Sequence, residues 1–301
     1  MCQRREQMIR ITPDQTTLGF IGTGVMGQSM AGHLLKAGYR VNVFSRTRSK
    51  TDALCEQGAV WMESVAQLAK ASNVIITIVG FPSDVEEVYG GSGGIIENAE
   101  PSSIAIDMTT SDPALAQKLS KTGLKREIHV LDAPVSGGDI GAKNAALSIM
   151  VGGDKAAFDA VLPLFEIMGQ NIVYQGGPGS GQHTKMANQI AIASGMVAVC
   201  EAISYAKHAG LDPETVLESI GKGAAGSWSL SNLGPRMIAG NYDPGFFVKH
   251  FIKDMNIALE SSKGMGIKTP GLDLAKSLYD ELVAKGCEND GTQALYKLYT
   301  E

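Results

Sequence analysis

A glycine-rich turn near the beginning of the chain restricts its fold more than any other feature. The turn, Gly22-Thr-Gly-Val-Met-Gly27, follows the apolar run Leu18–Ile21 and leads into an amphipathic stretch, Met26–Ala37. Between a strand and a helix, the first glycine permits a tight turn, the second lets a ligand approach the backbone, and the third lets the helix pack on the strand. Free N–H groups at the helix start attract a pyrophosphate. We therefore predict dinucleotide binding by Gly22, Thr23, Gly24, Val25, Met26 and Gly27, against the alternative of a plain turn.

Short apolar runs alternate with amphipathic stretches between residues 17 and 178, which is typical of βαβ units and a mostly parallel sheet. Several runs are rich in Val and Ile, as strands buried on both faces are. The predicted strands are Leu18–Ile21, Val41–Phe44, Val74–Val79, Ile104–Asp107, Val130–Asp132, Leu147–Val151 and Ile172–Tyr174. The predicted helices are Met26–Ala37, Lys50–Gln57, Val65–Ala71 and one that starts at Pro113 after the capping residue Asp112.

The strand pattern stops after Gly181, and helical patterns follow to the end of the chain. They predict a long helix over 179–210, and then Pro213–Ile220, Ser229–Ala239, Lys249–Lys263, Gly271–Lys285 and Gly291–Tyr299. The expected architecture is an α/β Rossmann domain over 17–178, followed by an all-α domain over 179–301 that is built on a long interdomain helix. Residues 1–16 are polar, and we expect a disordered leader there.

The long helix carries the candidate reactive group. Lys185 and Asn188 are three residues apart, so they share one helix face. We expect Lys185 to be desolvated at the start of an apolar helix, which moves the pKa of an amine toward neutrality and suits it to acid/base work on a carbonyl oxygen. Asn188 could hold the hydroxyl or carboxylate of a substrate. The alternative for any single helix lysine is a solvated charge.

The helix that follows Lys185 is apolar on every side over Ile190–Val199. Such a helix must be covered by other helices or by a partner subunit. We therefore predict a homodimer.

The segment after the second predicted strand indicates the choice of cofactor. An NAD-selecting site has Asp or Glu about 20 residues beyond the glycine turn, where it binds the ribose hydroxyls. This chain has Ser45, Arg46 and Thr47 at that point. A guanidinium pairs with a 2′-phosphate, whereas a carboxylate repels it. We predict NADP(H), with NAD(H) possible as the second choice; a solvated basic loop is the alternative.

Three further segments contain candidate site residues. Thr110 lies in a hydroxyl-rich loop after a predicted strand and is a candidate cofactor contact, although Ser111 and Asp112 could simply cap the next helix. Ser136, Gly137 and Gly138 offer a hydroxyl and successive N–H groups to a carboxylate, or form an ordinary turn. Lys253 and Asp254 lie among apolar residues, where the lysine could reach cofactor or active site; a surface charge pair is the alternative.

Composition and spacing argue against several classes of protein. The net charge of −5 and the lack of a basic stripe argue against nucleic-acid binding. The four cysteines and five histidines show no metal-ligand spacing, so we predict no metal site. The N-terminus lacks the apolar core of a signal peptide, and Asn188, Gln189 and Glu201 interrupt the best candidate for a membrane span. We expect a cytoplasmic protein without a membrane partner.

The motifs, taken in order, resemble the β-hydroxyacid dehydrogenase family, which includes 3-hydroxyisobutyrate dehydrogenase and the semialdehyde reductases. Gly19-Phe-Ile-Gly-Thr-Gly-Val-Met-Gly27 is similar to its cofactor fingerprint, Asp132-Ala-Pro-Val-Ser-Gly-Gly138 to its substrate segment, Gly181-x-x-x-Lys185-x-x-Asn188 to its catalytic segment, and Lys253-Asp254 to its last motif. The resemblance implies that Lys185 is the acid/base, that Ser136, Gly137, Gly138 and Asn188 bind substrate, and that Thr110 and Lys253 contact cofactor. It also implies a homodimer or a homotetramer.

The resemblance leaves alternatives open. The family often has a second asparagine where this chain has Gln189, which bears on substrate choice more than on activity. A small carboxylate-bearing hydroxyacid or semialdehyde is the expected substrate. An imine reductase would commonly have Asp or Tyr in place of Lys185, and a non-catalytic scaffold would be expected to lose that lysine.

Overall fold

The computed structural model describes residues 11–300, and the chain divides into two compact units, residues 1–185 and 186–301. Residues 1–10 of the predicted leader lie outside the described residues. Residues 11–16 are ordered, contrary to the prediction. Ile11 and Thr16 are buried, and the N–H of Thr12 donates to Thr16 Oγ1 at 3.1 Å. This short turn is held because Ile11 packs into the core of the first unit.

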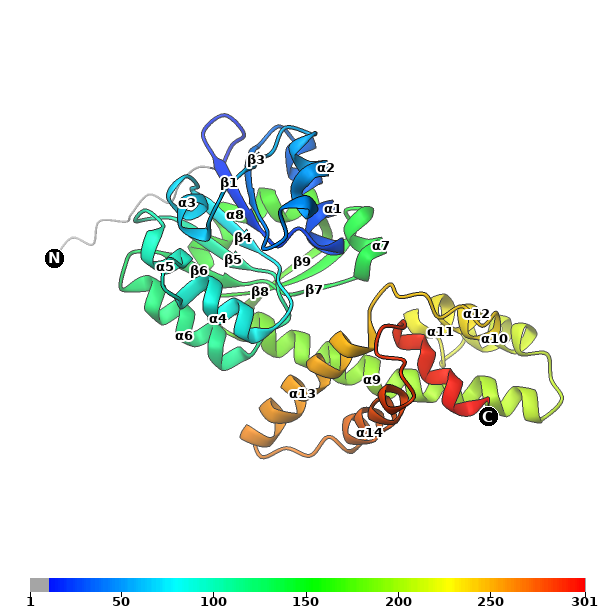
Figure 1. Cartoon of the computed structure of the whole chain (residues 1–301). Helices are drawn as coiled ribbons and strands as arrows, with labels where there is room; N and C mark the ends of the chain where they lie inside the picture. The colour runs from blue at the N-terminus through cyan, green and yellow to red at the C-terminus, as the bar shows by residue number, and fades with distance from the viewer. Residues whose placement is uncertain (1–10, 301) are drawn as a thin grey trace. The chain divides into compact units, whose positions relative to one another are not determined.

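The described residues of the first unit form one nine-stranded sheet with the order β3-β2-β1-β4-β5-β6-β8-β7, and β9 pairs with β8 (Figure 1). Neighbouring strands from β3 to β6 are parallel, whereas β8 runs antiparallel to β6 and β7 and parallel to β9. The strands are β1 (Thr17–Ile21), β2 (Arg40–Phe44), β3 (Val60–Trp61), β4 (Val74–Thr77), β5 (Ile104–Asp107), β6 (His129–Asp132), β7 (Val135–Ser136), β8 (Leu147–Gly152) and β9 (Gly169–Gly176).

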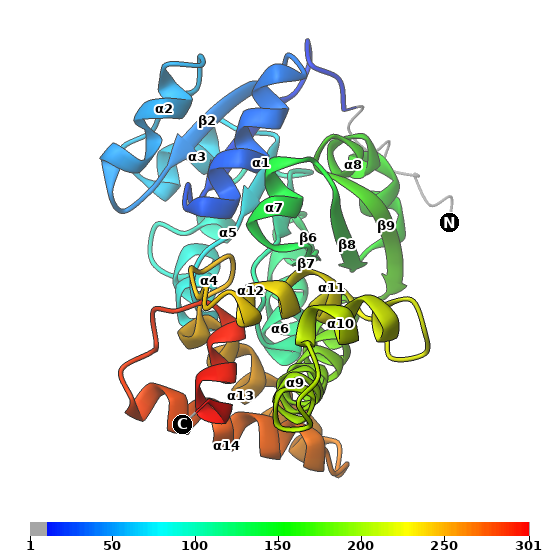
Figure 2. The same ribbon diagram turned by 90° about the vertical axis from the view of Figure 1, so that its right-hand side faces the viewer.

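Helices cover both faces of this sheet (Figures 1 and 2). They are α1 (Val25–Lys36), η1 (Arg48–Thr51), α2 (Asp52–Cys55), α3 (Val65–Lys70), α4 (Pro82–Gly90), α5 (Ile95–Asn98), α6 (Pro113–Leu124), α7 (Gly138–Lys143) and α8 (Lys155–Met168). Strand side chains alternate between the faces. Val74 and Ile76 of β4 therefore join the cluster under α1 and α8, and Ile75 joins the cluster under α3, α4 and α6.

The predicted Rossmann domain is present, with local differences. All seven predicted strands occur, but the two-residue strands β3 and β7 and the helices α4, α5, α7 and α8 were not predicted. The predicted helix over 50–57 is a 3₁₀ turn followed by the short α2. Asp112 does cap α6, because its Oδ1 accepts from the N–H of Ala114 at 2.8 Å. The elements β3, β7, α5 and α7 have only two to six residues, which carry too little periodicity to be recognised. The longer helices α4 and α8, of nine and fourteen residues, were missed as well.

The second unit is helical, as predicted. Its elements are the long α9 (Ser180–His208), which begins in the first unit, and α10 (Pro213–Gly221), α11 (Trp228–Asn232), α12 (Gly234–Ile238), α13 (Val248–Gly264), α14 (Pro270–Ala284) and η2 (Thr292–Tyr299). The predicted helix over 229–239 is split in two because Pro235 lacks an N–H and clashes with the preceding turn. The last predicted helix is a 3₁₀ helix.

The core of the second unit forms around α9. Buried residues of α9, including Met196, Cys200 and Ile203, pack in one cluster with Phe251 of α13 and Tyr279 of α14. The rings of Phe251 and Tyr279 meet edge to face at 5.2 Å. Within the described residues, α9 is long and apolar enough to cross a membrane by length and composition. Its packing against α13 and α14 is that of a core helix.

The division between the units falls later than predicted. The sequence predicts the domain boundary at residue 178, at the glycine-rich turn before α9. The compact units instead divide after Lys185, within α9. The reason is that the first turns of α9 are hydrogen-bonded to loops of the sheet, as described below.

Candidate active site

The glycine turn after β1 has the geometry expected of a dinucleotide-binding turn. Gly22 has a φ of +97°, and a Cβ there would overlap the carbonyl oxygen of Ile78. A Cβ at Gly27 would overlap the carbonyl oxygen of Gly22, so this glycine lets α1 pack closely on the turn. By contrast, no heavy atom lies within 4 Å of the position that a Cβ would take on Gly24. Gly24 thus leaves space for a ligand to reach the backbone.

The N-terminus of α1 is suited to an anion. Gly24 is its N-cap without a capping side chain, and no acidic residue lies in its first turn. Thr23 is 3% exposed, and its hydroxyl has no hydrogen-bond partner within the described part of the chain. Free N–H groups at the start of a helix of this length favour a phosphate. These residues therefore fit the pyrophosphate of a dinucleotide.

The basic segment after β2 contains an ion pair that sequence analysis missed. Arg46 Nη1 lies 2.9 Å from Asp84 Oδ1, and the side chains of Arg46 and Asp84 are 77% and 14% exposed. Asp84 is the third residue of α4, and its Oδ2 accepts from the N–H of Phe81 at 3.0 Å. An acidic residue three positions after a helix cap is a recognisable capping signal, but it does not indicate the arginine. Ser45 is half-buried and Thr47 is exposed beside Arg46.

The loops that follow β4 and β5 are tied together by hydroxyl and carboxylate groups. Asp107 Oδ1, at the end of β5, accepts from Thr77 Oγ1 at 3.0 Å and from the N–H of Thr109 at 3.0 Å. Complete burial raises the pKa of Asp107 to about 6, although these hydrogen bonds oppose the shift. Thr109 Oγ1 in turn accepts from the N–H of Val79 at 2.9 Å. The predicted cofactor residue Thr110 is half-buried and comes next in this loop.

The start of α9 is fixed by a buried carboxylate at the end of β6. Asp132 Oδ1 accepts from the N–H of Gly179 at 2.8 Å, and Asp132 Oδ2 accepts from the N–H of Gln182 at 2.9 Å. Burial raises the pKa of Asp132, and the backbone N–H groups oppose that rise. A Cβ on Gly152 or Gly181 would lie within 3 Å of this carboxylate. The two glycines therefore create the space in which the carboxylate holds the helix.

A second contact joins α9 to the loop after β5. The amide of Gln182, which is fully buried, donates from Nε2 to the carbonyl oxygen of Thr109 at 2.7 Å. Its Oε1 accepts from the N–H of Ser111 at 2.9 Å. Ser111 thus gives its N–H to Gln182, and Asp112 alone supplies the capping carboxylate for α6. Sequence analysis missed Gln182, because a glutamine in the first turn of a helix does not indicate a contact with a loop more than 70 positions earlier in the chain.

The predicted acid/base lies directly after this fixed turn. Lys185 is 6% exposed on α9, which confirms that it is buried rather than a solvated surface charge. Lys185 comes three positions after Gln182, so both lie on the helix face that meets the sheet loops. The described contacts therefore hold the backbone of Lys185 through Asp132 and Gln182.

The segment after β6 has the backbone geometry of an anion-binding turn. Ser136 ends β7, where it pairs with Ser148 of β8. Gly137 and Gly138 follow with φ values of +127° and +61°, and Gly137 is the N-cap of α7. No heavy atom lies within 4 Å of a Cβ position on Gly138. The half-buried hydroxyl and the adjacent N–H groups are thus available at one edge of the sheet.

In the second unit, two hydrogen bonds and one ion pair connect Asn188 to Lys253. Asn188 Nδ2 donates to Gln189 Oε1 at 2.7 Å, and Gln189 Nε2 donates to Asp254 Oδ2 at 2.6 Å. Asp254 Oδ1 lies 3.0 Å from Lys253 Nζ. Gln189 and Asp254 are each 1% exposed. Lys253 and Asp254 are therefore not a solvated surface pair, and the longer side chain of Gln189 bridges α9 to α13.

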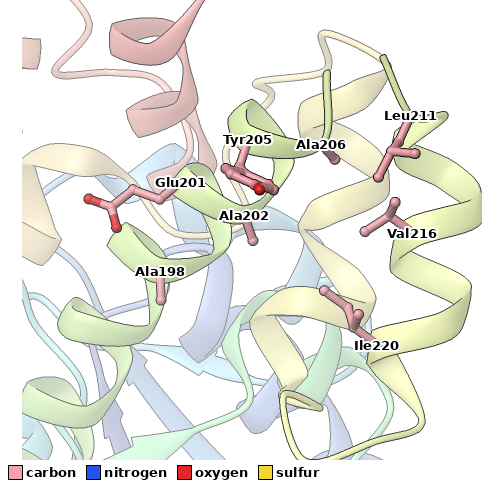
Figure 3. A pocket seen from close by; sticks show the side chains of 8 residues that line it. All are labelled: Ala198, Glu201, Ala202, Tyr205, Ala206, Leu211, Val216 and Ile220. Carbon is pink, nitrogen blue, oxygen red and sulfur yellow. The ribbon is translucent and has the colours of Figure 1, made fainter. Parts of the chain in front are cut away.

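An open groove of about 480 Å³ lies elsewhere on the second unit, between α9 and α10 (Figure 3). Ala198, Ala202 and Tyr205 of α9 face Val216 and Ile220 of α10 across it. None of the predicted site residues lines this groove. Among the described residues, no group of three or more His, Cys, Asp or Glu side chains is placed to hold a metal ion.

Comparison with known proteins identifies the family of the chain. Residues 17–176 match the NAD-binding domain of 6-phosphogluconate dehydrogenase, and residues 179–299 match the NAD-binding domain of NADP-dependent 3-hydroxyisobutyrate dehydrogenase. An uncharacterized oxidoreductase of Bacillus subtilis, YkwC, is 61% identical over 95% of this chain and 99% of its own length. The 2-hydroxy-3-oxopropionate reductase of Escherichia coli is 39% identical over 89% of this chain and 92% of its own length.

Solved structures show the same fold. The 3-hydroxyisobutyrate dehydrogenase of Mycobacterium tuberculosis with L-serine has a TM-score of 0.88 at 26% identity, covering 95% of this chain and 99% of that one. Psf3 in complex with NADP⁺ and 2-OPP has a TM-score of 0.86 at 25% identity, covering 94% and 100%. The chain therefore belongs to the β-hydroxyacid dehydrogenase family, as an NAD(P)-dependent oxidoreductase with a Rossmann domain followed by a helical domain.

Proposed function

We propose that this protein is an NADP(H)-dependent oxidoreductase that interconverts a small β-hydroxyacid and its semialdehyde by hydride transfer, with Lys185 as acid/base. The observation that carries the proposal is the burial of Lys185 on a helix start that Asp132 and Gln182 fix to the sheet. Burying an amine has a free-energy cost, so such a position calls for a function. A protein that only bound a cofactor would need no buried amine there.

In this proposal each residue has a defined task. A bound nicotinamide supplies the hydride chemistry. Lys185 Nζ protonates the carbonyl oxygen of the substrate as the aldehyde is reduced, and it removes the hydroxyl proton in the opposite direction. Asn188 orients the reacting oxygen through its amide. Ser136, Gly137 and Gly138 bind the substrate carboxylate with the serine hydroxyl and the N–H groups that the positive φ angles expose.

The proposed substrate class is a small acid with a hydroxyl or aldehyde group near its carboxylate. Support comes from the anion-binding turn at Ser136–Gly138 and from relatives named as a 3-hydroxyisobutyrate dehydrogenase and a 2-hydroxy-3-oxopropionate reductase. The basic segment Ser45–Thr47 supports NADP(H), as does a neighbour that is bound to NADP⁺. Thr110 and Lys253 are proposed as further cofactor contacts, and NAD(H) is the second choice.

The test is an initial-rate screen of glyoxylate, succinic semialdehyde, tartronate semialdehyde and 3-hydroxyisobutyrate, each with NADP(H) and NAD(H). We expect at least one of these acids to turn over, with the wild-type rate lost in Lys185→Ala by at least about a hundredfold, the usual effect of removing an acid/base. Equal turnover by Lys185→Ala would remove the acid/base assignment. Faster turnover of a cyclic imine than of any acid would contradict the substrate class.

We also propose that the protein is a cytoplasmic homodimer or homotetramer. The groove between α9 and α10 supports assembly, because its apolar rim residues Tyr205 and Leu211 are 77% and 54% exposed. Cys55, Cys200 and Cys287 are free thiols, which supports a reducing compartment. Light scattering of the full chain tests the assembly, and a Tyr205→Glu variant of unchanged mass would exclude this groove from the interface.

A further inference from the structure

The ion pair between Arg46 and Asp84 joins two segments on opposite sides of the glycine turn. Arg46 follows β2 and Asp84 lies in the first turn of α4, which follows β4. Both strands are hydrogen-bonded neighbours of β1, so the glycine turn that follows β1 lies between them in the strand order. A carboxylate from the β4 side thus reaches the arginine that is proposed to bind the 2′-phosphate of NADP(H).

The two partners differ in how firmly they are held. Asp84 is largely buried, and its Oδ2 is engaged by the N–H of Phe81 at the start of α4. Arg46 is exposed and contacts Asp84 through one nitrogen only, whereas a guanidinium has five N–H groups. Asp84 is therefore the fixed member of the pair. Within the described residues only Nη1 of Arg46 donates to Asp84, so the remaining N–H groups of this exposed guanidinium can donate to a second anion.

The charge of Asp84 acts on the two cofactors differently. Arg46 and Asp84 together carry no net charge, so a 2′-phosphate meets a guanidinium that is already partly neutralised. The phosphate must share the guanidinium with the carboxylate or displace it, and the two anions repel each other. NAD(H) has a ribose hydroxyl instead of the phosphate and is not subject to this repulsion. The pair should therefore lower the affinity for NADP(H) selectively.

We propose that Asp84 is a specificity-determining residue. It weakens NADP(H) binding by neutralising Arg46, and so reduces the difference in affinity between NADP(H) and NAD(H). The inference rests on the proposed phosphate role of Arg46. Arg48 has a different neighbour, because its guanidinium lies over the Trp61 ring at 4.6 Å from the ring centre. Exposed ion pairs between side chains have small effects, which sets the expected change at about two- to fivefold in Kd.

The test is the Asp84→Asn variant, with the binding of NADPH and NADH measured by calorimetry without substrate. Asparagine keeps an oxygen for the N–H of Phe81 and removes only the charge. We expect the Kd for NADPH to fall about two- to fivefold at low salt and the Kd for NADH to stay unchanged. The gain should shrink between about 20 and about 300 mM salt, because screening shortens the range of the charge.

Glu86→Gln is the matched control, since Glu86 lies on the same helix and pairs with Lys118 Nζ at 2.6 Å. It removes the same charge without touching Arg46, and we expect no change in either Kd. An equal gain in Glu86→Gln would overturn the proposal by showing a general charge effect.

Arg46→Ala separates this inference from the proposed function. If Arg46→Ala weakens NADPH and NADH equally, the phosphate role fails and the role of Asp84 fails with it. If Arg46→Ala weakens NADPH alone while Asp84→Asn leaves NADPH unchanged or weaker, only the Asp84 inference is overturned. A weaker NADPH complex in Asp84→Asn would show that the carboxylate orients Arg46 for the phosphate.

Discussion

The Asp132 carboxylate holds the start of α9 through the N–H groups of Gly179, at 2.8 Å, and Gln182, at 2.9 Å. The acidic group comes from the end of β6, so the strand that leads to the proposed substrate turn also sets the position of the helix that carries Lys185. A carboxylate accepts at both oxygens, and both are used here. The proposed substrate-binding turn and the proposed acid/base are thereby tied to one side chain.

Asp132→Asn should therefore damage both stability and activity. Asparagine has one carbonyl oxygen, and its NH₂ group would face a second backbone N–H. Leaving one buried N–H unpaired costs about 1–3 kcal/mol. Thermal unfolding should show a lower Tm, and kcat should fall because the backbone of Lys185 shifts.

Asp154→Asn serves as the control for Asp132→Asn. Asp154 caps α8 by accepting from the N–H of Ala157 through Oδ1. Asparagine can reproduce that single bond, so this variant should lose much less stability and no activity. Equal losses in the two variants would contradict the special role of Asp132.

Gly24→Ala should weaken dinucleotide binding with little effect on stability, whereas Gly22→Ala should lower the stability of the apo protein. A Cβ on Gly24 meets no atom within 4 Å, so its effect on apo stability should stay below about 1 kcal/mol, the usual loss for alanine at an N-cap. The methyl group would occupy the ligand's approach to the backbone, and dinucleotide affinity should fall at least about tenfold.

Gly22→Ala places a Cβ against the carbonyl oxygen of Ile78 at a positive φ, so this variant should lose about 1–3 kcal/mol of stability before any ligand is added. Thermal unfolding and dinucleotide titration of both variants check this, and unchanged affinity in Gly24→Ala would contradict the assignment.

Asp107 should make stability decrease as the pH rises from about 4 to about 7. Burial raises its pKa in the folded state from 3.8 to about 6, so the folded protein holds a proton that the unfolded chain has released. Its favourable contribution is therefore complete below pH 3.8 and is lost as the pH rises through about 6. The shift of about two units corresponds to about 3 kcal/mol.

Asp107→Asn removes this titration while keeping an oxygen for the N–H of Thr109. Between about pH 5 and about pH 8, the Tm of wild type should fall relative to the Tm of Asp107→Asn, because only wild type loses the contribution of the protonated carboxyl group. A Tm difference that is constant over this range would contradict the raised pKa of Asp107.

Gln189→Asn should show whether the hydrogen bonds from Asn188 through Gln189 to Asp254 contribute to substrate binding or only to stability. The shorter side chain cannot span from Asn188 to Asp254, so a buried bond to a charged group is lost, at a cost of about 1.5–3 kcal/mol. Because Asn188 loses its partner, KM for the acid should rise more than kcat falls. Steady-state kinetics with varied substrate check this split. A lower Tm with unchanged KM would assign Gln189 to the core of the second unit alone.

The glycine turn, the buried strands and the change to an all-helical pattern after Gly181 were determined by the sequence alone. These features depend on local geometry and on hydrophobic periodicity, which neighbouring residues in the chain specify. The resemblance of the motifs to one family was readable for the same reason, because each motif occupies a short segment. The burial of Lys185 was also predictable, because Lys185 lies near the start of an apolar helix.

Only the tertiary structure decided which side chains fix those segments. Asp84 reaches Arg46 across 38 positions of the chain, Asp132 reaches Gly179 across 47, and Gln189 reaches Asp254 across 65. Such contacts depend on the order of the strands in the sheet and on helix packing, and hydrophobic periodicity does not specify which polar side chains meet. The division after Lys185 has the same cause, because Asp132 and Gln182 bind the first turns of α9 to the sheet.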